Sequence, residues 1–403
     1  MKAYQDASLA PVRRAKALLE EMTLAEKIGQ LNQRLYGFRI YERKCVNGED
    51  TIELSEEFCQ EVEKYSGLGV LYGLYRADPW ADKNYETGLT GVLSKKAYNQ
   101  VQRYVLEHSR LGIPVMMSSE CPHGHQALDG YLLPVNLLAG ATFDPAMVRA
   151  AYRVSGRQLQ NMGVDLALMS MLDVLRDPRW GRSEECYSED PYLSARMAEA
   201  AVIGMQESGP EVVAKHFAAQ GEGTGGVNAS AARIGERELR EIHFPPAAAA
   251  IKAGAKGIMA AYNEIDGVYC HANRWLLNDV IRKEMGFDGI VMSDGVAIDQ
   301  LDSMTGDNVV SGALALQSGV DVGLWDEAFG KLEEAVRRGL VKEAQIDQAV
   351  LRVLTLKFER GLFEHPYLEE EGEIHMDYAQ NPESVQLCLL YTSDAADDSL
   401  RVD

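Results

Sequence analysis

One short pattern recurs along most of this chain and limits its fold more than any other feature. An apolar segment of a few residues is followed by a polar or glycine-containing turn and then by an amphipathic helix. The apolar segments are too short for helices, and such runs between turn signals are typical of strands buried on both faces of a parallel sheet. We predict strands at residues 69–74, 114–119, 165–170, 212–217, 257–262, 289–293 and 319–323.

Polar residues stand at the carboxyl ends of these predicted strands, and this distinguishes a barrel from an open sheet. A ring of strands brings all such residues to one axial pocket, whereas an open sheet gathers only those near its switch point. We therefore expect an α/β fold, a (β/α)8-like TIM barrel that is somewhat irregular because only seven strands are evident. The polar strand-end residues are Glu120, Asp173, Lys215, His216, Tyr262, Asn263 and Asp294, with Asp321 inside the last strand.

An N-terminal helical extension is predicted before the first strand. Apolar residues between 10 and 33 recur at helical spacings, and Thr23 with Glu26 three residues later forms a capping box. The barrel domain is expected to span residues 1–365. An acidic, polar linker towards a missing second domain follows at 366–387. Residues 388–403 resemble the translation of a sequencing adapter and are predicted to be a non-native tail.

Charge and composition exclude several classes of partner. The chain has 40 Lys and Arg against 61 Asp and Glu, a formal charge of −21, which disfavours nucleic acid and anionic membrane surfaces. No glycine-rich phosphate loop follows a strand, and no run of about 18 apolar residues could span a membrane. Six cysteines without paired spacing fit reduced thiols, so a cytoplasmic location is predicted, with no secretory signal.

Several ordered motifs carry a resemblance to a known family. They read Met22-Thr23-Leu24-Ala25-Glu26-Lys27-Ile28-Gly29-Gln30, Arg176-Asp177-Pro178-Arg179-Trp180-Gly181-Arg182, Tyr187-Ser188-Glu189-Asp190-Pro191, Ala214-Lys215-His216-Phe217, Gly225-Gly226-Val227-Asn228, Glu236-Arg237-Glu238-Leu239-Arg240-Glu241, Gly289-Ile290-Val291-Met292-Ser293-Asp294-Gly295 and Leu356-Lys357-Phe358-Glu359-Arg360-Gly361-Leu362-Phe363. Together they resemble the N-terminal catalytic domain of glycoside hydrolase family 3, a group of β-glucosidases, β-xylosidases and related exo-acting enzymes.

The resemblance implies roles for particular residues. Asp294 would be the nucleophile of a retaining hydrolase that forms a covalent glycosyl-enzyme. Lys215 and His216 would donate hydrogen bonds to sugar hydroxyls, although Lys215 could instead form a structural ion pair with a neighbouring acid. Arg182 and Tyr262 match sugar-binding and nucleophile-orienting positions, and Arg182 could equally be held in a network with Glu184 or Glu189.

The chain departs from the family pattern in three places. Glu120 stands where the family often has Asp, and its extra methylene could crowd a hydroxymethyl group and favour a pentose. Gly295 replaces a Trp that frequently follows the nucleophile, so one wall of the pocket is open or supplied from elsewhere. The loop after His216 lacks the Asp-His pair of the single-domain N-acetylglucosaminidases.

We therefore expect an exo-acting β-glucosidase-like hydrolase, with a β-xylosidase as the alternative, acting on a β-linked oligosaccharide or an aryl or alkyl glycoside. The general acid would lie in the missing second domain, which would impair this fragment, and Glu222 is a weak substitute. A non-catalytic sugar-binding fragment and a class I aldolase-type lyase using Lys215 stay open. No cofactor and no metal is expected, because the cluster Glu120-Cys121-Pro122-His123-Gly124-His125 is a poor tetrahedral ligand set. A homo-oligomer is compatible with the sequence.

Overall fold

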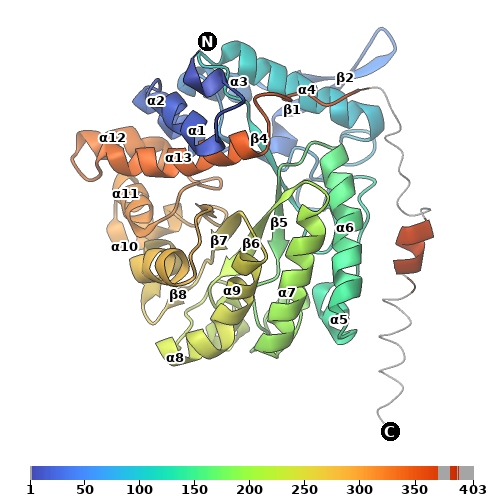
Figure 1. Cartoon of the computed structure of the whole chain (residues 1–403), viewed down its shortest axis with the longest axis vertical. Helices are drawn as coiled ribbons and strands as arrows, with labels where there is room; N and C mark the ends of the chain where they lie inside the picture. Colours follow the sequence, from blue (N-terminus) through green and yellow to red (C-terminus); the bar gives the residue numbers. More distant parts are fainter. Residues whose placement is uncertain (1, 371–381, 388, 390–403) are drawn as a thin grey trace.

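A parallel sheet of six strands runs through the centre of the molecule (Figure 1) in the order β10-β7-β6-β5-β4-β3. The computed structural model describes residues 2–370, 382–387 and 389, and these are the residues discussed below. The six strands match six of the seven predicted ones. They are β3 (Val70–Tyr72), β4 (Met116–Glu120), β5 (Leu166–Ser170), β6 (Glu211–Phe217), β7 (Gly257–Ala260) and β10 (Ile290–Met292).

The seventh predicted strand, at 319–323, is an extended segment with a single parallel bridge between Val322 and Met292. The backbone N–H of Ser293 donates to the carbonyl of Val322 at 2.8 Å, and that of Asp321 donates to the carbonyl of Val291 at 2.7 Å. The segment therefore lies beside β10 and continues the sheet by one member, as predicted, without forming a regular ladder.

Residues 31–36 close the sheet into a ring. The N–H groups of Gly323 and Trp325 donate to the carbonyls of Leu31 and Gln33, each at 3.0 Å. On the other side of the segment, Tyr36 forms a parallel bridge with Tyr72 of β3. The helical pattern that we extended to Gln33 ends at Gln30, because the next residues pair with backbone on both sides. The result is an eight-membered (β/α) barrel, as expected from the sequence, with two irregular members.

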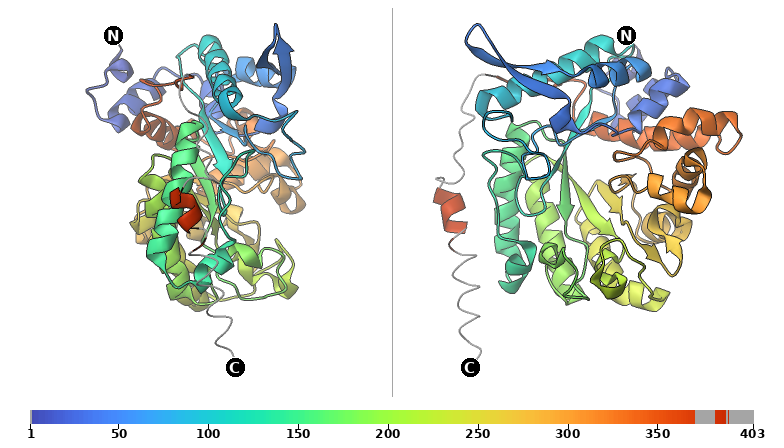
Figure 2. Two further views of the ribbon diagram at one scale, coloured as in Figure 1. Left: turned by 90° about the vertical axis from the view of Figure 1, so that its right-hand side faces the viewer. Right: turned by 180° about the vertical axis from the view of Figure 1, so that it is seen from behind.

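Helices surround the ring, as the views from the side and from behind show (Figure 2). Successive strands are joined by a helix packed outside, which buries the outer face of each strand. The main helices are α4 (Gly91–His108), α6 (Pro145–Asn161), α7 (Pro191–Gln206), α9 (Phe244–Lys252), a helix at Trp275–Glu284, α11 (Asn308–Ser318), α12 (Leu332–Arg337) and α13 (Glu343–Glu359). Shorter ones are α5 (Asn136–Ala141), α8 (Glu236–Glu238) and α10 (Asp302–Thr305).

The N-terminal extension consists of α1 (Pro11–Leu19) and α2 (Leu24–Gln30), and α1 lies along α13 (Figure 1). The predicted capping box is present, since the Glu26 N–H donates to Thr23 Oγ1 at 3.3 Å and the Thr23 N–H to Glu26 Oε2 at 2.8 Å. Lys357 of α13 is fully buried and donates to oxygens of Gln30, Leu68 and Pro114, which ties α2 to the strand starts.

An antiparallel hairpin that we did not predict follows the extension. It comprises β1 (Tyr41–Val46) and β2 (Glu49–Leu54), and α3 (Glu56–Tyr65) follows it. The turn residues Asn47 and Gly48 have φ of 55° and 86°, which suits the Asn-Gly pair of a tight hairpin turn. A second small hairpin, β8 (Glu264–Ile265) with β9 (Val268–Tyr269), follows β7.

Only part of the predicted linker can be located. Residues 382–387 are helical and contact α6, where Glu383 pairs with Arg157 at 2.7 Å, and the Tyr131 hydroxyl donates to the Ser384 carbonyl at 2.8 Å. Residues 371–381 and all of the predicted adapter tail except Leu389 lie outside the described residues. The proposed domain boundaries stay predictions.

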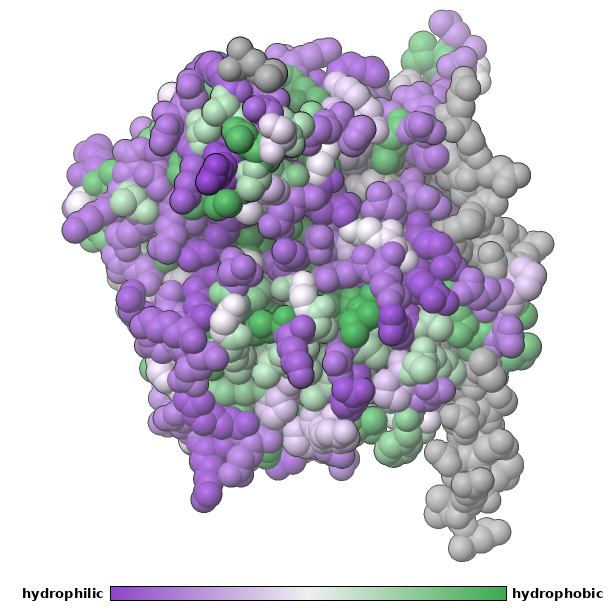
Figure 3. All heavy atoms as spheres, in the orientation of Figure 1, coloured by the Kyte–Doolittle hydropathy of each residue, from purple (hydrophilic) through white to green (hydrophobic). Residues whose placement is uncertain are grey.

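Hydrophilic side chains cover most of the face shown in Figure 3, in keeping with the acidic composition. Among the described residues, no helix is both long and apolar enough to cross a membrane. The five described cysteines, Cys45, Cys59, Cys121, Cys186 and Cys270, are free thiols.

Candidate active site

Asp294 lies two residues after the end of β10 and is 8% exposed, so its carboxylate is largely sheltered from solvent. Oδ1 accepts the Gly295 N–H at 2.8 Å. Oδ2 has no hydrogen-bond partner within the part of the chain that the structure describes. The Asp294 N–H donates to Nε2 of His271, and burial lowers the pKa of His271 to about 3, which keeps that nitrogen an acceptor. One carboxylate oxygen is thus fixed and the other is left for a ligand.

His216 at the end of β6 faces Asp294, with 3.8 Å between its Nε2 and Asp294 Oδ2. Its Nδ1 donates to Asp173 Oδ2 at 2.8 Å, because a carboxylate can only accept. Nε2 accepts from Arg182 Nη2 at 3.0 Å. Both ring nitrogens of His216 are thus engaged, which explains why His216 leaves Asp294 Oδ2 unbonded.

Arg182 is held by a bidentate pair with Glu185, at 2.7 and 2.8 Å. Burial disfavours the charge of each partner, but the pair outweighs burial. It raises the pKa of Arg182 above its usual range, with the Asp294 carboxylate contributing, and lowers the pKa of Glu185 to about 2. Arg182 is therefore held in an ion-pair network, as considered from the sequence, although the acid is Glu185 rather than Glu184 or Glu189. The same guanidinium also contacts His216.

Tyr262 follows β7, and its hydroxyl donates to the carbonyl of Gly295 at 2.8 Å. Burial and the nearby Asp294 carboxylate raise the pKa of Tyr262 well above its usual range. The phenol therefore stays protonated and fixes the backbone that carries Asp294.

Glu120 and Lys215 form a second cluster, with Lys215 Nζ 2.6 Å from Glu120 Oε2. The Tyr72 hydroxyl donates to Glu120 Oε1 at 3.1 Å, and Arg76 lies 4.0 Å from it. Burial opposes ionisation of Glu120, but Lys215 and Arg76 overcome it and lower the pKa of that carboxyl. The structural ion pair that we considered for Lys215 exists.

The local course of β6 places Lys215 and His216 in these two clusters. The register of β6 against β7 shifts between Ala214 and Phe217. Such irregularities re-aim side chains at strand ends next to active sites. Lys215 and His216, although consecutive in the chain, therefore belong to two neighbouring clusters at the same end of the barrel.

Two other predicted candidates are paired with different residues. Glu222 contacts Arg176 at 3.4 Å and His243 at 3.5 Å, and His243 is the main cause of its lowered pKa, the wrong direction for a general acid. Asp321 pairs with Arg282 and Arg352 on the surrounding helices.

Two residues of the cluster at 120–125, which the sequence offered as possible metal ligands, have other partners. Nε2 of His125 lies 2.8 Å from Ser119 Oγ, and Glu120 is engaged with Lys215. No three His, Cys, Asp or Glu side chains of the described chain are grouped in a way that could hold a metal ion.

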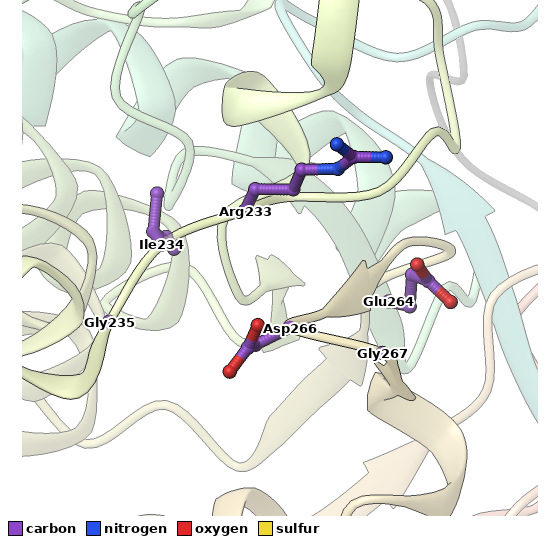
Figure 4. Close-up of a pocket in the computed structure, with 6 residues that line it drawn as sticks. All are labelled: Arg233, Ile234, Gly235, Glu264, Asp266 and Gly267. Atoms are coloured by element: carbon purple, nitrogen blue, oxygen red, sulfur yellow. The ribbon is translucent and has the colours of Figure 1, made fainter.

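A hollow at the β8–β9 hairpin contains none of the predicted site residues. It is lined by Arg233, Ile234 and Gly235 on one side and by Glu264, Asp266 and Gly267 of the hairpin on the other (Figure 4).

Sequence reasoning missed Tyr72, Arg76, Glu185, His271 and Trp325. The ring of Trp325 occupies the space beside Gly295, where a Cβ would lie 2.4 Å from it. The wall that a residue after the nucleophile could have formed is thus supplied from elsewhere. Two of these residues had a signal in the sequence, since Arg76 and Trp325 each lie two residues beyond the end of a predicted strand.

Comparison with known proteins shows which family the chain resembles. Residues 23–356 match the model of the glycosyl hydrolase family 3 N terminal domain. A periplasmic beta-glucosidase of Salmonella typhimurium is 32% identical over 87% of this chain and 42% of its own length. A beta-xylosidase of Formosa agariphila is 33% identical over 72% of this chain and 43% of its own length.

Comparison with solved structures supports the same family. A β-glucosidase of Erythrobacter marinus superimposes with a TM-score of 0.85 at 31% identity over 98% of this chain and 51% of its own. A mutant β-glucosidase of Listeria innocua, in complex with laminaribiose, gives 0.80 at 29% identity over 95% of this chain and 51% of its own. The chain spans about half the length of these relatives. On this sequence match and this fold, the chain belongs to glycosyl hydrolase family 3 and corresponds to its N-terminal domain.

Proposed function

We propose that this chain is the barrel part of a retaining, exo-acting β-glycosidase that hydrolyses terminal non-reducing β-D-glucosyl residues, with Asp294 as the nucleophile. The observation that carries the proposal is the asymmetry of the Asp294 carboxylate. Oδ1 is held by the Gly295 N–H, while the buried Oδ2 is unbonded within the described chain and 3.8 Å from His216.

In the proposed reaction, Asp294 Oδ2 attacks the anomeric carbon as the bond from that carbon to the leaving oxygen breaks. The leaving oxygen takes a proton from a general acid, and water later releases the sugar from Asp294. The buried guanidinium of Arg182, held beside His216, supplies positive charge near the attacking carboxylate.

The sugar hydroxyls would be bound by Lys215, Glu120 and Arg182, whereas His216, whose ring nitrogens are engaged with Asp173 and Arg182, would hold Arg182 in place. Glu120 offers acceptor oxygens and Lys215 offers donors, and each is already fixed by the other at 2.6 Å. Such pre-organised pairs bind a sugar with little loss of side-chain entropy. Tyr262 would act on the position of Asp294 through the Gly295 carbonyl.

A retaining mechanism needs a second carboxyl group about 5–5.5 Å from the nucleophile. Glu222 does not suit that role, because its pKa is lowered by His243. We propose that the acid belongs to a part of the whole enzyme beyond this barrel. The solved relatives are about twice as long as this chain, which supports that proposal.

The test uses a 2-deoxy-2-fluoro β-glucoside with a dinitrophenolate leaving group, which departs without protonation. Mass spectrometry of the purified chain is expected to show one glycosyl adduct on the peptide that contains Asp294. The Asp294→Asn variant is the control and should give none. An unlabelled chain would remove Asp294 as the nucleophile, and sugar binding without labelling would favour a sugar-binding fragment.

A β-xylosidase is the second candidate, favoured by the length of Glu120. Its carboxylate is fixed by Lys215 and Tyr72, so it cannot withdraw from a hydroxymethyl group without breaking both contacts. Labelling by the matching 2-fluoro xyloside faster than by the glucoside would identify this candidate. An aldolase-type role is disfavoured, because Lys215 Nζ is engaged by Glu120 at 2.6 Å, whereas a Schiff base needs an amine that is free to attack a carbonyl.

A further inference from the structure

Gly295, next to Asp294, is a glycine because of what packs against it. Its φ is not positive, so backbone conformation does not require it. A Cβ at this position would lie 2.4 Å from both Cε3 and Cζ3 of Trp325, closer than real Cβ atoms approach. Any side chain at 295 would therefore displace the Trp325 indole.

Hydrogen bonds on both sides of Asp294 fasten the segment that carries Trp325. The Leu324 N–H donates to Ser293 Oγ at 2.7 Å, and the Val296 N–H donates to the Leu324 carbonyl at 2.8 Å. Ser293 Oγ donates in turn to Asp326 at 2.6 Å. The indole is thus held in a fixed position relative to the nucleophile.

Aromatic rings back and extend the indole. Tyr36 stacks on Trp325 with 4.7 Å between centroids, and Tyr72 meets it edge-on at 4.8 Å. Trp80 continues the surface at 5.2 Å and is 45% exposed. Since the Tyr72 hydroxyl binds Glu120, the indole lies between the Asp294 cluster and the Glu120 cluster.

We propose that Trp325 is a specificity-determining residue, the aromatic wall on which the apolar C–H face of a bound pyranose packs beside Asp294, and that Gly295 exists to admit it. This inference rests on the proposed glycosidase function. A pyranose presents polar hydroxyls at its edge and apolar C–H groups on its face, so a pocket with charged groups at one side and a fixed indole at another matches both.

The test measures calorimetric binding of methyl 1-thio-β-D-glucoside and of the matching thioxyloside, which are not hydrolysed. Trp325→Leu, which keeps an apolar side chain but loses the aromatic face, is expected to weaken binding of the preferred sugar at least tenfold. Trp325→Phe should restore most of the affinity. Trp275→Leu, a change on an outer helix, is the matched control and should bind like wild type.

The packing of Trp325 against Gly295 is tested by Gly295→Ala. It should weaken binding as much as Trp325→Leu does, and the double variant should be no worse than Trp325→Leu alone, because both changes remove the same wall. Thermal unfolding of each variant, compared with the Trp275→Leu control, separates lost binding from lost folding.

Wild-type affinity in Trp325→Leu would contradict the role of Trp325 in sugar binding. Additive effects in the double variant would contradict the dependence of that role on the packing between Gly295 and Trp325. If Trp325→Leu weakens sugar binding although the fluoro glycoside does not label the wild-type chain, this inference stands while the proposed function fails. A wild-type chain that binds neither thioglycoside would overturn the inference.

Discussion

Removing Lys215 is the most informative perturbation of the candidate site. Its ammonium lies 2.6 Å from Glu120, and the two side chains are 6% and 12% exposed. Breaking such a buried pair from one side leaves an uncompensated charge, which typically destabilises a protein by about 3–5 kcal/mol. Tyr72 still donates to Glu120 and Arg76 stays 4.0 Å away, so we expect Lys215→Met to lower the unfolding free energy by about 3 kcal/mol at pH 7.

The loss should depend on pH with a definite sign. Lys215 helps to hold the pKa of Glu120 below its ordinary value of 4.5. In wild type this contributes stability above pH 4.5 that disappears as the pH falls through the lowered pKa. Without Lys215 the carboxyl is easier to protonate, so the deficit of Lys215→Met relative to wild type should shrink between pH 7 and pH 4.

Urea unfolding at several pH values is the assay. Glu120→Gln combined with Lys215→Met should recover part of the loss, because no buried charge is then left unpaired. Lys283→Met is the matched control, since Lys283 pairs with Asp279 at the same 2.6 Å but is 70% exposed, and its loss should stay below about 1 kcal/mol. A Lys215→Met loss no larger than that of the control, or a double variant as unstable as the single one, would contradict a stabilising buried pair between Lys215 and Glu120.

Three further outcomes are expected. Asp173→Asn should slow labelling of Asp294 about 10- to 100-fold, because a charge-assisted hydrogen bond to His216 worth about 1.5–3 kcal/mol is weakened; an unchanged labelling rate would contradict this. Glu185→Gln should remove stability of about 3 kcal/mol that wild type has above pH 4.5 and loses towards pH 2, as acid titration of unfolding will show. Lys357→Met should lower the unfolding free energy by at least about 2 kcal/mol in urea, since three buried oxygens lose their donor.

The barrel was predictable because its signal is local. Each strand is a short apolar run, and the polar residue at its end is visible in the sequence, which is how Glu120, Lys215, His216, Tyr262 and Asp294 were found. The structure brings these residues to one end of the ring in two adjacent clusters. Their catalytic roles remain proposals.

What the sequence hid depends on contacts between distant segments. Residues 31–33 continue the helical pattern, and only their pairing with residues 323 and 325 makes them part of the sheet. Glu185 was one of several acids near Arg182, and local spacing could not select it. Trp325 was hidden for a related reason, because its importance follows from the missing side chain at Gly295, which lies on a neighbouring segment.

The closing segment at 31–36 also has a consequence for the order of folding. Its partners on one side, residues 323 and 325, are made near the end of synthesis of the barrel, whereas β3 on the other side is made early. Contacts between residues so far apart in the chain are slow to form, because the entropy of closing the intervening loop must be lost first. We therefore expect residues 31–36 to keep one edge unpaired until residues 323 and 325 have been synthesised. The fit of Trp325 beside Asp294 is completed by that same final step.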